Sequence, residues 1–282
     1  MTNGQEEREI INRVEAIELL GISEKAFDNY RKYSGELNRI EGQRFILFYK
    51  DEIERFKALK DSRTINLTMR EYETCFQFAI KVVYGGAALH GIRGTRSEVQ
   101  AADDWILGIL AEHAFKKFLS EKFNTEIRLD NEVHPGNITA QDVVGIEDGE
   151  NIRRPRVRVG IKASKMKNAY LVLSPIEVEA EDRHSDIYIF ARVGLPSDHL
   201  FRILRDHSFF RDVSRWLQGQ ENFRSIEALE EVPVWITGYA EAENLDSVGE
   251  IPGQIFDGMR YVKQVSQLRN SDADWRRFIE ML

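Results

Sequence analysis

The chain has 282 residues and a formal net charge of −8, with 42% hydrophobic and 30% charged residues, a composition typical of a globular protein with a substantial core. Its single cysteine, Cys75, excludes an intramolecular disulfide and any multi-cysteine zinc site. Because no apolar run approaches the ~20 residues of a membrane span and the start MTNGQEERE is too polar for a signal peptide, we expect a cytoplasmic protein with no membrane partner.

Residues 1–62 show the pattern of a small helical module. A first helix is expected to end at Gly21, and Ser23 is a good N-cap for a second helix. Alternation over residues 37–49 predicts a hairpin, and Asp51 can cap a third helix. This order of elements is that of a winged helix-turn-helix, which we expect to form a domain separate from residues 63–282.

The segments VEAIELLGISEKAFDNYRK and FILFYKDEIERF resemble the small MerR or excisionase type of winged helix. The resemblance covers only this module. It implies that the second helix faces a DNA groove and that the wing touches phosphate, through Lys25, Asn29, Arg31 and Lys32 on the helix and Arg39 and Arg44 on the wing. Because the module holds more acids than bases, a module that serves only for protein contact is the alternative.

Two longer helices are predicted next, over residues 68–84 and 97–123. The glycine-rich segment between them carries Arg93 and Arg96, which we expect at the edge of a site that binds DNA. Glu112 lies near the border of the buried stripe of the second helix. A carboxylate in that position needs a partner, and a metal ion or a lysine is a candidate.

A hairpin opened by Asp142 and closed by Lys162 carries the strongest chemical signal. Residues 143–146 predict one strand, Asp148-Gly149 a turn, and residues 156–162 alternate strictly as a second strand. The apolar side chains of the second strand should enter a core, and its basic side chains share the other face.

Seven Lys or Arg and no acid occur between Arg153 and Lys167, in a chain that is acidic overall. A positive stripe beside an aspartate indicates a phosphate substrate and a metal ion that neutralises the carboxylate. An edge hairpin with a basic solvent face is the alternative interpretation of the same residues.

These features together resemble the core of the PD-(D/E)XK nucleases, over roughly residues 97–240. The shared features are a helix with an inward glutamate, an aspartate and a lysine on successive strands, and then alternating helices and strands. The resemblance implies that Asp142 is the metal-binding aspartate, Lys162 the motif lysine and Glu112 the helix glutamate. The segments SDIYIFARV and VPVWITGYA fit the two outer strands of that core.

One position departs from the family pattern, because Gly160 stands where an acidic residue is expected. A second metal carboxylate would then come from Glu112, or from Glu177 or Glu179, or the domain is inactive. We favour Glu112, because a helix beside the predicted hairpin can present its carboxylate on the same side as Asp142.

The implied reaction is hydrolysis of a phosphodiester bond with Mg²⁺. Asp142 and Glu112 would hold the metal ion, and Lys162 would orient or help deprotonate the attacking water and stabilise the developing charge. Ser164 and Lys165 would hold the neighbouring phosphate.

The segments IKASKMKNAYLVL and HSDIYIFARVGL also resemble restriction enzymes of the BisI type, which implies cleavage of DNA that carries 5-methylcytosine. We therefore expect a sequence-specific endonuclease of type II restriction type that acts on double-stranded DNA. Cutting both strands needs two active sites or two successive nicks, which is compatible with a homodimer on DNA. The alternatives are a non-enzymatic winged-helix transcription regulator and an RNA-directed nuclease.

The last part of the chain gives structural expectations only. Residues 199–218 predict one or two helices, whose large apolar side chains we expect in the core: Phe201, Leu204, Phe209 and Trp216. The amphipathic tail over residues 258–282 is expected to pack on the core or on a second subunit.

Overall fold

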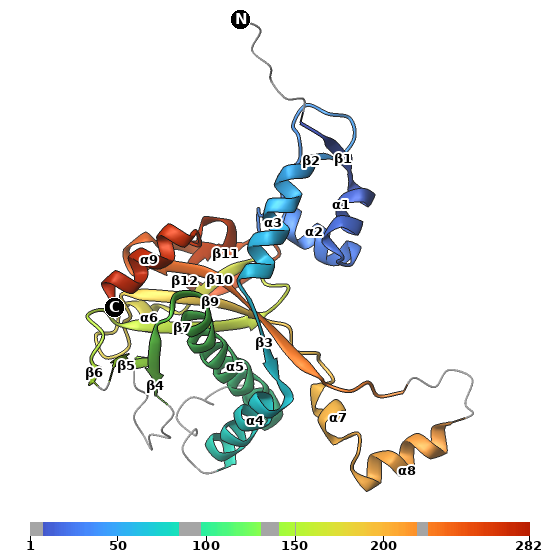
Figure 1. Ribbon diagram of the computed structural model, residues 1–282, viewed down its shortest axis with the longest axis vertical. Helices are drawn as coiled ribbons and strands as arrows, with labels where there is room; N and C mark the ends of the chain where they lie inside the picture. Colours follow the sequence, from blue (N-terminus) through green and yellow to red (C-terminus); the bar gives the residue numbers. More distant parts are fainter. Residues whose placement is uncertain (1–7, 85–96, 131–140, 150, 219–224) are drawn as a thin grey trace, which may run out of the picture.

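The computed structural model describes residues 8–84, 97–130, 141–149, 151–218 and 225–282. The chain is a mixed α/β protein, as its sequence predicts. A small N-terminal module stands at one end of a larger body, and helix α3 leads from the module directly into the first strand of the body (Figure 1).

The N-terminal module consists of β1 (Ile10–Asn12), α1 (Arg13–Leu20), α2 (Glu24–Lys32), β2 (Leu47–Tyr49) and α3 (Lys50–Ser62). The body begins with β3 (Thr64–Thr68), α4 (Met69–Tyr84), α5 (Glu98–Phe123), β4 (Glu126–Leu129), β5 (Val143–Asp148) and β6 (Asn151–Arg153). It continues with β7 (Val159–Lys165), β8 (Tyr170–Leu173), α6 (Pro175–Glu179), β9 (Ile187–Val193), α7 (His199–Leu204) and α8 (Ser208–Leu217). It ends with β10 (Glu231–Glu241), β11 (Asp246–Ile251), β12 (Gln254–Gln264) and α9 (Asp272–Met281).

Side-chain caps fix the starts of the long helices. The Ser23 hydroxyl accepts a hydrogen bond from the backbone of Ala26 at the start of α2, and Ser97 forms a reciprocal capping box with Gln100 at the start of α5. Gly21 ends α1 with a φ of 64°, in the left-handed region that glycine adopts without a steric penalty. The helix boundaries predicted at these residues are confirmed.

The main sheet has the strand order β3-β10-β9-β7, in which β7 and β9 are parallel and the other pairs are antiparallel. Every residue of β9 is buried, because both faces of the sheet are covered. Ile189 and Val193 point to the core under α5, whereas Tyr188 and Phe190 point to the opposite face.

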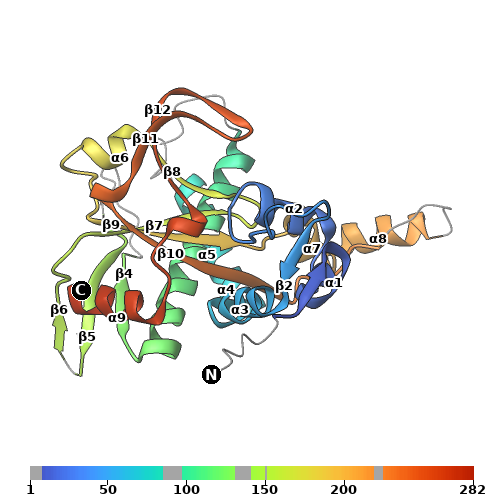
Figure 2. The same ribbon diagram turned by 90° about the horizontal axis from the view of Figure 1, so that it is seen from above.

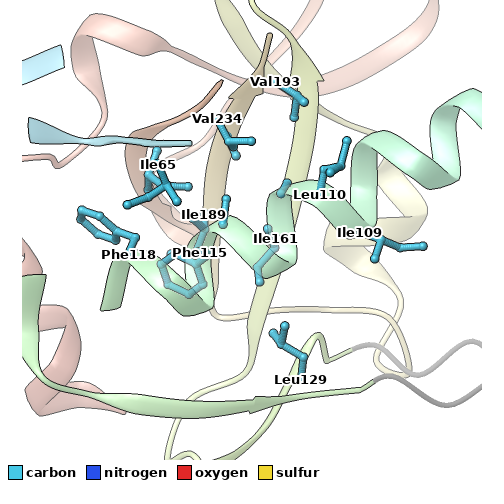
Figure 3. Close-up of a cluster of buried hydrophobic side chains, with 14 of the residues drawn as sticks. Ile65, Ile109, Leu110, Phe115, Phe118, Leu129, Ile161, Ile189, Val193 and Val234 are labelled. Atoms are coloured by element: carbon cyan, nitrogen blue, oxygen red, sulfur yellow. The ribbon is translucent and has the colours of Figure 1, made fainter. Parts of the chain in front are cut away.

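Helix α5 lies across one face of the main sheet and supplies much of the core. Phe115 and Phe118 are fully buried and lie beside Ile65 of β3 and Ile161 of β7 (Figure 3). The C-terminal helix α9 adds Trp275, whose ring centroid lies 4.9 Å from that of Phe118. The amphipathic tail therefore packs on the core of its own chain, which was one of its two expected positions.

The opposite face of the main sheet is shared by a second sheet, of strand order β11-β12-β8, and by the N-terminal module. Arg192 of β9 is fully buried there and forms an ion pair with Glu36 at 3.0 Å. Trp235 of β10 contacts Tyr30 of α2 and Phe56 of α3, each with ring centroids 5.9 Å apart. These contacts dock the module firmly on the sheet.

The predicted hairpin between residues 143–146 and 156–162 is wrong in its pairing. Strand β5 pairs with β4 and β6, while β7 belongs to the main sheet beside β9. Gly149, with a φ of 62°, closes a tighter hairpin to β6. Pro155, which has no N–H for a strand ladder, follows β6, and the chain then crosses to the other sheet.

The hairpin predicted over residues 37–49 is also wrong in its pairing. Strand β2 pairs with β1 at the start of the chain, and a single backbone bond, from the Ile40 N–H to the Leu47 carbonyl, joins the expected arms. The turn itself is present, since Gly42 has a φ of 76°.

The expectation that the aromatic residues of α7 and α8 enter the core is wrong as well. Phe201 is 56% exposed, Phe209 64% and Trp216 75%. Helix α8 extends away from the body (Figures 1 and 2) and has no buried residue, so the core does not reach it. Helix α7 touches the core through Ile203 and the buried His199, but its Phe201 stays exposed. Across the described residues, none of the helices combines the length and hydrophobicity that a bilayer crossing requires.

Candidate active site

The outer edge of β7 is where Asp142 meets the strand that carries Lys162. The Asp142 backbone N–H donates to the Val159 carbonyl at 3.2 Å, and the Asp142 Oδ2 accepts a hydrogen bond from the Ile161 N–H. Asp142 therefore bonds to β7 much as a neighbouring strand would. This contact, rather than a hairpin, brings the carboxylate close to the lysine.

Glu112 approaches the same place from α5, which packs on β7. Burial, and then the nearby charges of Asp142 and Asp130, raise the pKa of Glu112 well above its usual value, while Lys162 acts in the opposite direction. Burial also raises the pKa of Asp142, while the hydrogen bond from the Ile161 N–H and the charge of Lys162 act in the opposite direction. The three residues predicted from the sequence are half-buried and thus share one electrostatic environment.

Glu177 is the direct partner of Lys162, because its Oε1 lies 2.7 Å from the Lys162 Nζ. The segment Ser174-Pro175 starts α6 and holds the other oxygen of Glu177, which accepts from the Ser174 N–H at 2.9 Å and from its hydroxyl at 2.8 Å. Burial opposes the charges of both groups. The ion pair outweighs burial, so the pKa of Lys162 is raised and that of Glu177 is lowered.

The space above Gly160 is already filled, which explains why no acidic side chain stands there. A Cβ at Gly160 would lie 2.8 Å from the Ser185 Oγ and 3.3 Å from the Tyr188 ring. The Tyr188 hydroxyl donates to the Glu177 carbonyl at 2.6 Å, so the residues that occupy this space also support α6. A carboxylate on this side of the sheet comes from α6 instead of from β7.

We expect the variant Gly160→Ala to lower the free energy of unfolding by about 1–3 kcal/mol, because the added methyl overpacks against Ser185. Removing the Ser185 hydroxyl in the double variant Gly160→Ala/Ser185→Ala should restore part of the loss. Urea denaturation measures both effects. Gly249→Ala is the matched control, since the nearest atom to its Cβ is 3.9 Å away. Equal loss in the control would contradict the steric explanation.

Two acidic residues of this site were missed or passed over in the sequence. Glu177 is one of the alternative sources of the second carboxylate, and the capping pattern Ser174-Pro175-Ile176-Glu177 marks a helix start that fixes its position. Asp130 is not among the residues predicted from the sequence. It follows β4, and its backbone N–H donates to the Asp142 carbonyl at 3.1 Å.

The residues predicted to contact DNA from α2 have different environments. Lys25 is exposed, and Lys32 is half-exposed and lies 3.8 Å from Asp28. Arg31 is 16% exposed and lies 3.6 Å from the same aspartate. The Asn29 amide donates to the Lys167 carbonyl at 2.6 Å, so this side chain holds the module against the segment between β7 and β8.

The remaining predicted DNA contacts lie on the segment before β2 and after Lys162. Arg39 and Arg44 are exposed on the segment that precedes β2. Ser164 accepts a hydrogen bond from the Asn168 amide, and Lys165 lies 3.4 Å from Asp103. Two further predicted residues, Arg93 and Arg96, lie outside the described residues.

A second polar network connects α4, α5 and the start of α7. The buried His199 contacts the Tyr72 hydroxyl through Nδ1 at 2.5 Å and Asp103 through Nε2 at 2.9 Å. Burial lowers the pKa of His199 below 6.5, although Asp103 acts in the opposite direction. The network therefore favours a neutral imidazole at neutral pH.

Wild type should lose stability relative to His199→Gln as the pH falls from 7.5 to 5.5. The unfolded chain binds the histidine proton near pH 6.5, whereas the folded chain binds it only at lower pH, so protonation favours unfolding. The loss should begin near the unfolded pKa of about 6.5 and increase towards the folded value. Urea denaturation at several pH values measures the difference, with His207→Gln at an exposed histidine as control. A pH-independent difference would contradict this assignment.

The donor set of the site suits a divalent metal ion in its chemistry. Glu112 and Asp142 are half-buried carboxyls whose pKa values are raised, and a cation bound by both would offset their partial burial and their mutual repulsion. Hard oxygen ligands of this kind are those that Mg²⁺ prefers. Within the described part of the chain, no three His, Cys, Asp or Glu side chains are grouped closely enough to hold a metal by themselves.

Comparison of the chain with models of protein families, with curated proteins and with solved structures gave no match. The class of protein is therefore defined by its own fold and site. It is a mixed α/β protein with two half-buried carboxyls and a lysine–glutamate ion pair at the outer edge of a covered sheet.

Proposed function

We propose that this chain is a magnesium-dependent DNA endonuclease of restriction type with a PD-(D/E)XK-like core. The observation that carries the proposal is the meeting of Asp142, Glu112 and Lys162 at the edge of β7, from three separate elements. The order α5, β4, β5, β6, β7, β8, α6, β9 also supports it, because the helix with Glu112, the strand that Asp142 precedes and the strand with Lys162 follow one another as in that family.

In this proposal Asp142 and Glu112 hold the metal ion. A bound Mg²⁺ would polarise the scissile phosphate and lower the pKa of a bound water. Burial disfavours the charge of Lys162, but Glu177 and Asp142 together stabilise that charge more strongly. Lys162 therefore keeps its proton at neutral pH. It therefore acts mainly as a positive charge that stabilises the negative charge of the transition state, and less as a base.

Glu177 positions Lys162 in this mechanism. Its carboxylate is fixed by Ser174 and holds the lysine amine through a hydrogen bond from the Lys162 Nζ. It also supplies the charge that an acid at Gly160 would supply in the family pattern. The role that the sequence assigned to Glu112 alone is thus divided between Glu112, near Asp142, and Glu177, near Lys162.

Double-stranded DNA is the proposed substrate. The exposed basic side chains of Lys25, Arg39 and Arg44 lie on the N-terminal module. This module is docked on the same sheet as the site, through the Arg192–Glu36 ion pair and the hydrogen bond from Asn29. A reader of DNA sequence and a cleavage site would then be held in one rigid unit. A requirement for 5-methylcytosine, which rests on the resemblance to BisI-type enzymes, is part of this proposal.

A non-enzymatic transcription regulator is the second candidate. One observation favours it, namely that Glu177 already neutralises Lys162 at 2.7 Å, as in a purely structural ion pair. In that case the chain would bind DNA through its N-terminal module and cut nothing. Cleavage of RNA in place of DNA would indicate the third candidate, an RNA-directed nuclease.

The test is incubation of the full chain with Mg²⁺ and two copies of one plasmid, one methylated at cytosine and one unmethylated. We expect cleavage that EDTA abolishes, with defined ends that sequencing of the products can map. Cleavage of the methylated copy alone would support the methylation requirement. Binding without cutting of either copy would favour the regulator, and competition by RNA would identify an RNA-directed enzyme.

A further inference from the structure

Residues 198–217, which comprise α7 and α8, form an arm that projects from the body. Both views show helix α8 extending away from the sheet, with α7 joining it to the body (Figures 1 and 2). Helix α8 has no buried residue, although the spacing of its apolar side chains is that of a packing stripe, formed by Phe209, Phe210, Val213, Trp216 and Leu217. The arm therefore presents a packing face that its own chain does not cover within the described residues.

The exposed apolar area of the arm is large enough for a specific contact. Phe201 is 56% exposed, Leu204 44%, Phe209 64% and Trp216 75%. Since an aromatic side chain buries about 150–250 Å², the three exposed aromatics together offer on the order of 400 Å² of surface. A standard interface buries about 800 Å² on each partner, so this stripe could form its centre.

The charges of the arm fit a protein partner and not a phosphate backbone. Three aspartates and four arginines alternate along it: Asp198, Arg202, Arg205, Asp206, Arg211, Asp212 and Arg215. Most of the arginines are paired within the arm, with Arg202–Asp198 at 2.8 Å, Arg205–Asp206 at 3.4 Å and Arg215–Asp212 at 2.9 Å. A nearly neutral surface with both signs of charge is self-complementary, whereas nucleic acid selects a strongly positive one.

The base of the arm is fixed to the body. His199, the first residue of α7, contacts Tyr72 of α4 and Asp103 of α5. Arg202 adds an ion pair with Glu227 at 3.0 Å. Because α5 also carries Glu112, a partner held by the arm would have a fixed position relative to the candidate active site.

We propose that the arm is a dimerisation element whose apolar stripe packs against the same stripe of a second copy of this chain. A two-fold contact of this kind places one surface against itself, which requires apolar side chains in the middle and charges of both signs around them. The arm has both. Two active sites in one particle would allow both DNA strands to be cut, and this consequence alone rests on the proposed function.

The experiment measures molar mass by light scattering after size-exclusion chromatography, without DNA or metal, over a range of chain concentrations. Wild type should elute at twice 32.7 kDa. The variant Phe209→Glu/Trp216→Glu should elute at 32.7 kDa, and its thermal unfolding should retain the same cooperativity, since neither side chain is in the core. Ile255→Glu, at an 83% exposed residue of the β11–β12 hairpin, is the matched control and should remain dimeric.

A cysteine pair tests which surfaces meet. Ser214→Cys lies beside the stripe and should form an intermolecular disulfide in the dimer, whereas Ser247→Cys on β11 should not. The native Cys75 is buried and does not interfere.

A monomeric wild type, or a dimer that the arm variants leave intact, would overturn the proposal. The proposal would also be overturned if wild type were monomeric and the arm variants lost DNA binding, because the arm would then be a nucleic-acid surface. A dimer that crosslinks through Ser247→Cys and not through Ser214→Cys would place the contact on the β11–β12 hairpin and overturn the arm-to-arm packing. Failure of DNA cleavage with an intact dimer would refute the proposed function and leave the interface standing.

Discussion

Replacement of Lys162 by alanine is expected to lower magnesium-dependent plasmid cleavage by about 10²–10⁴-fold, the range typical for a positioned acid–base or charge-stabilising group. The physical reason is the position of Lys162, near the two half-buried carboxyls of Asp142 and Glu112 and held by Glu177 at 2.7 Å. Initial rates of supercoiled plasmid loss measure the effect. Asp142→Asn should cause a loss of similar size, because it removes a charge from the same site.

Lys263→Ala is the matched control for Lys162→Ala. Lys263 is also a strand lysine in an ion pair, with Asp246 at 3.3 Å, and it lies in the separate β11-β12-β8 sheet. The Lys263→Ala variant should cut DNA at the wild-type rate. Unchanged cleavage by Lys162→Ala would mean that the site does not carry the reaction, whatever its geometry.

Glu112→Gln is expected to abolish most cleavage and to raise stability. It removes one of two half-buried carboxyls that repel each other, so the metal-free protein at neutral pH should gain about 0.5–2 kcal/mol, as in other exchanges that relieve a strained functional site. Cleavage should fall by about 10²–10⁴-fold, because a proposed metal ligand is lost. Urea denaturation in EDTA and plasmid cleavage measure the two effects.

The raised pKa of Glu112 also predicts how the stability difference between wild type and Glu112→Gln changes with pH. Since burial raises the pKa of Glu112 above 4.5, the folded chain binds the proton more tightly than the unfolded chain. The stability of wild type relative to Glu112→Gln should therefore be highest below pH 4.5 and fall as the pH rises through the folded pKa. Glu121→Gln, at an exposed residue of the same helix, should show no such difference. A variant less stable than wild type in EDTA at neutral pH would contradict the assignment.

Local signals in the sequence determined most of the helices. Capping residues such as Ser23 and Ser97 act on their own neighbours, so helix starts can be predicted without knowledge of the rest of the chain. The same holds for the apolar run that became β9, whose burial on both faces follows from its composition. The candidate residues Asp142, Lys162 and Glu112 were also found from pattern and resemblance, before any of their contacts were known.

Strand pairing and exposure could be decided only by the tertiary structure. The alternation of residues 156–162 predicts a strand but does not identify its neighbour, and the neighbour proved to be β9, far along the chain. The apolar spacing of α8 likewise marks a packing face without showing whether its own core reaches it. The stripe on the arm is therefore a feature that the sequence shows and only the fold makes significant.

The sequence by itself determined which side chains could do chemistry, because residue type and local spacing limit that choice. The fold decided which of them share one environment. Gly160 is the clearest case. In the sequence, the absence of an acidic residue at this position is a departure from the family pattern. In the structure, Ser185 and Tyr188 occupy the space that a side chain at Gly160 would need. Glu177 on α6 then supplies the charge beside Lys162, because packing between distant segments sets which groups meet.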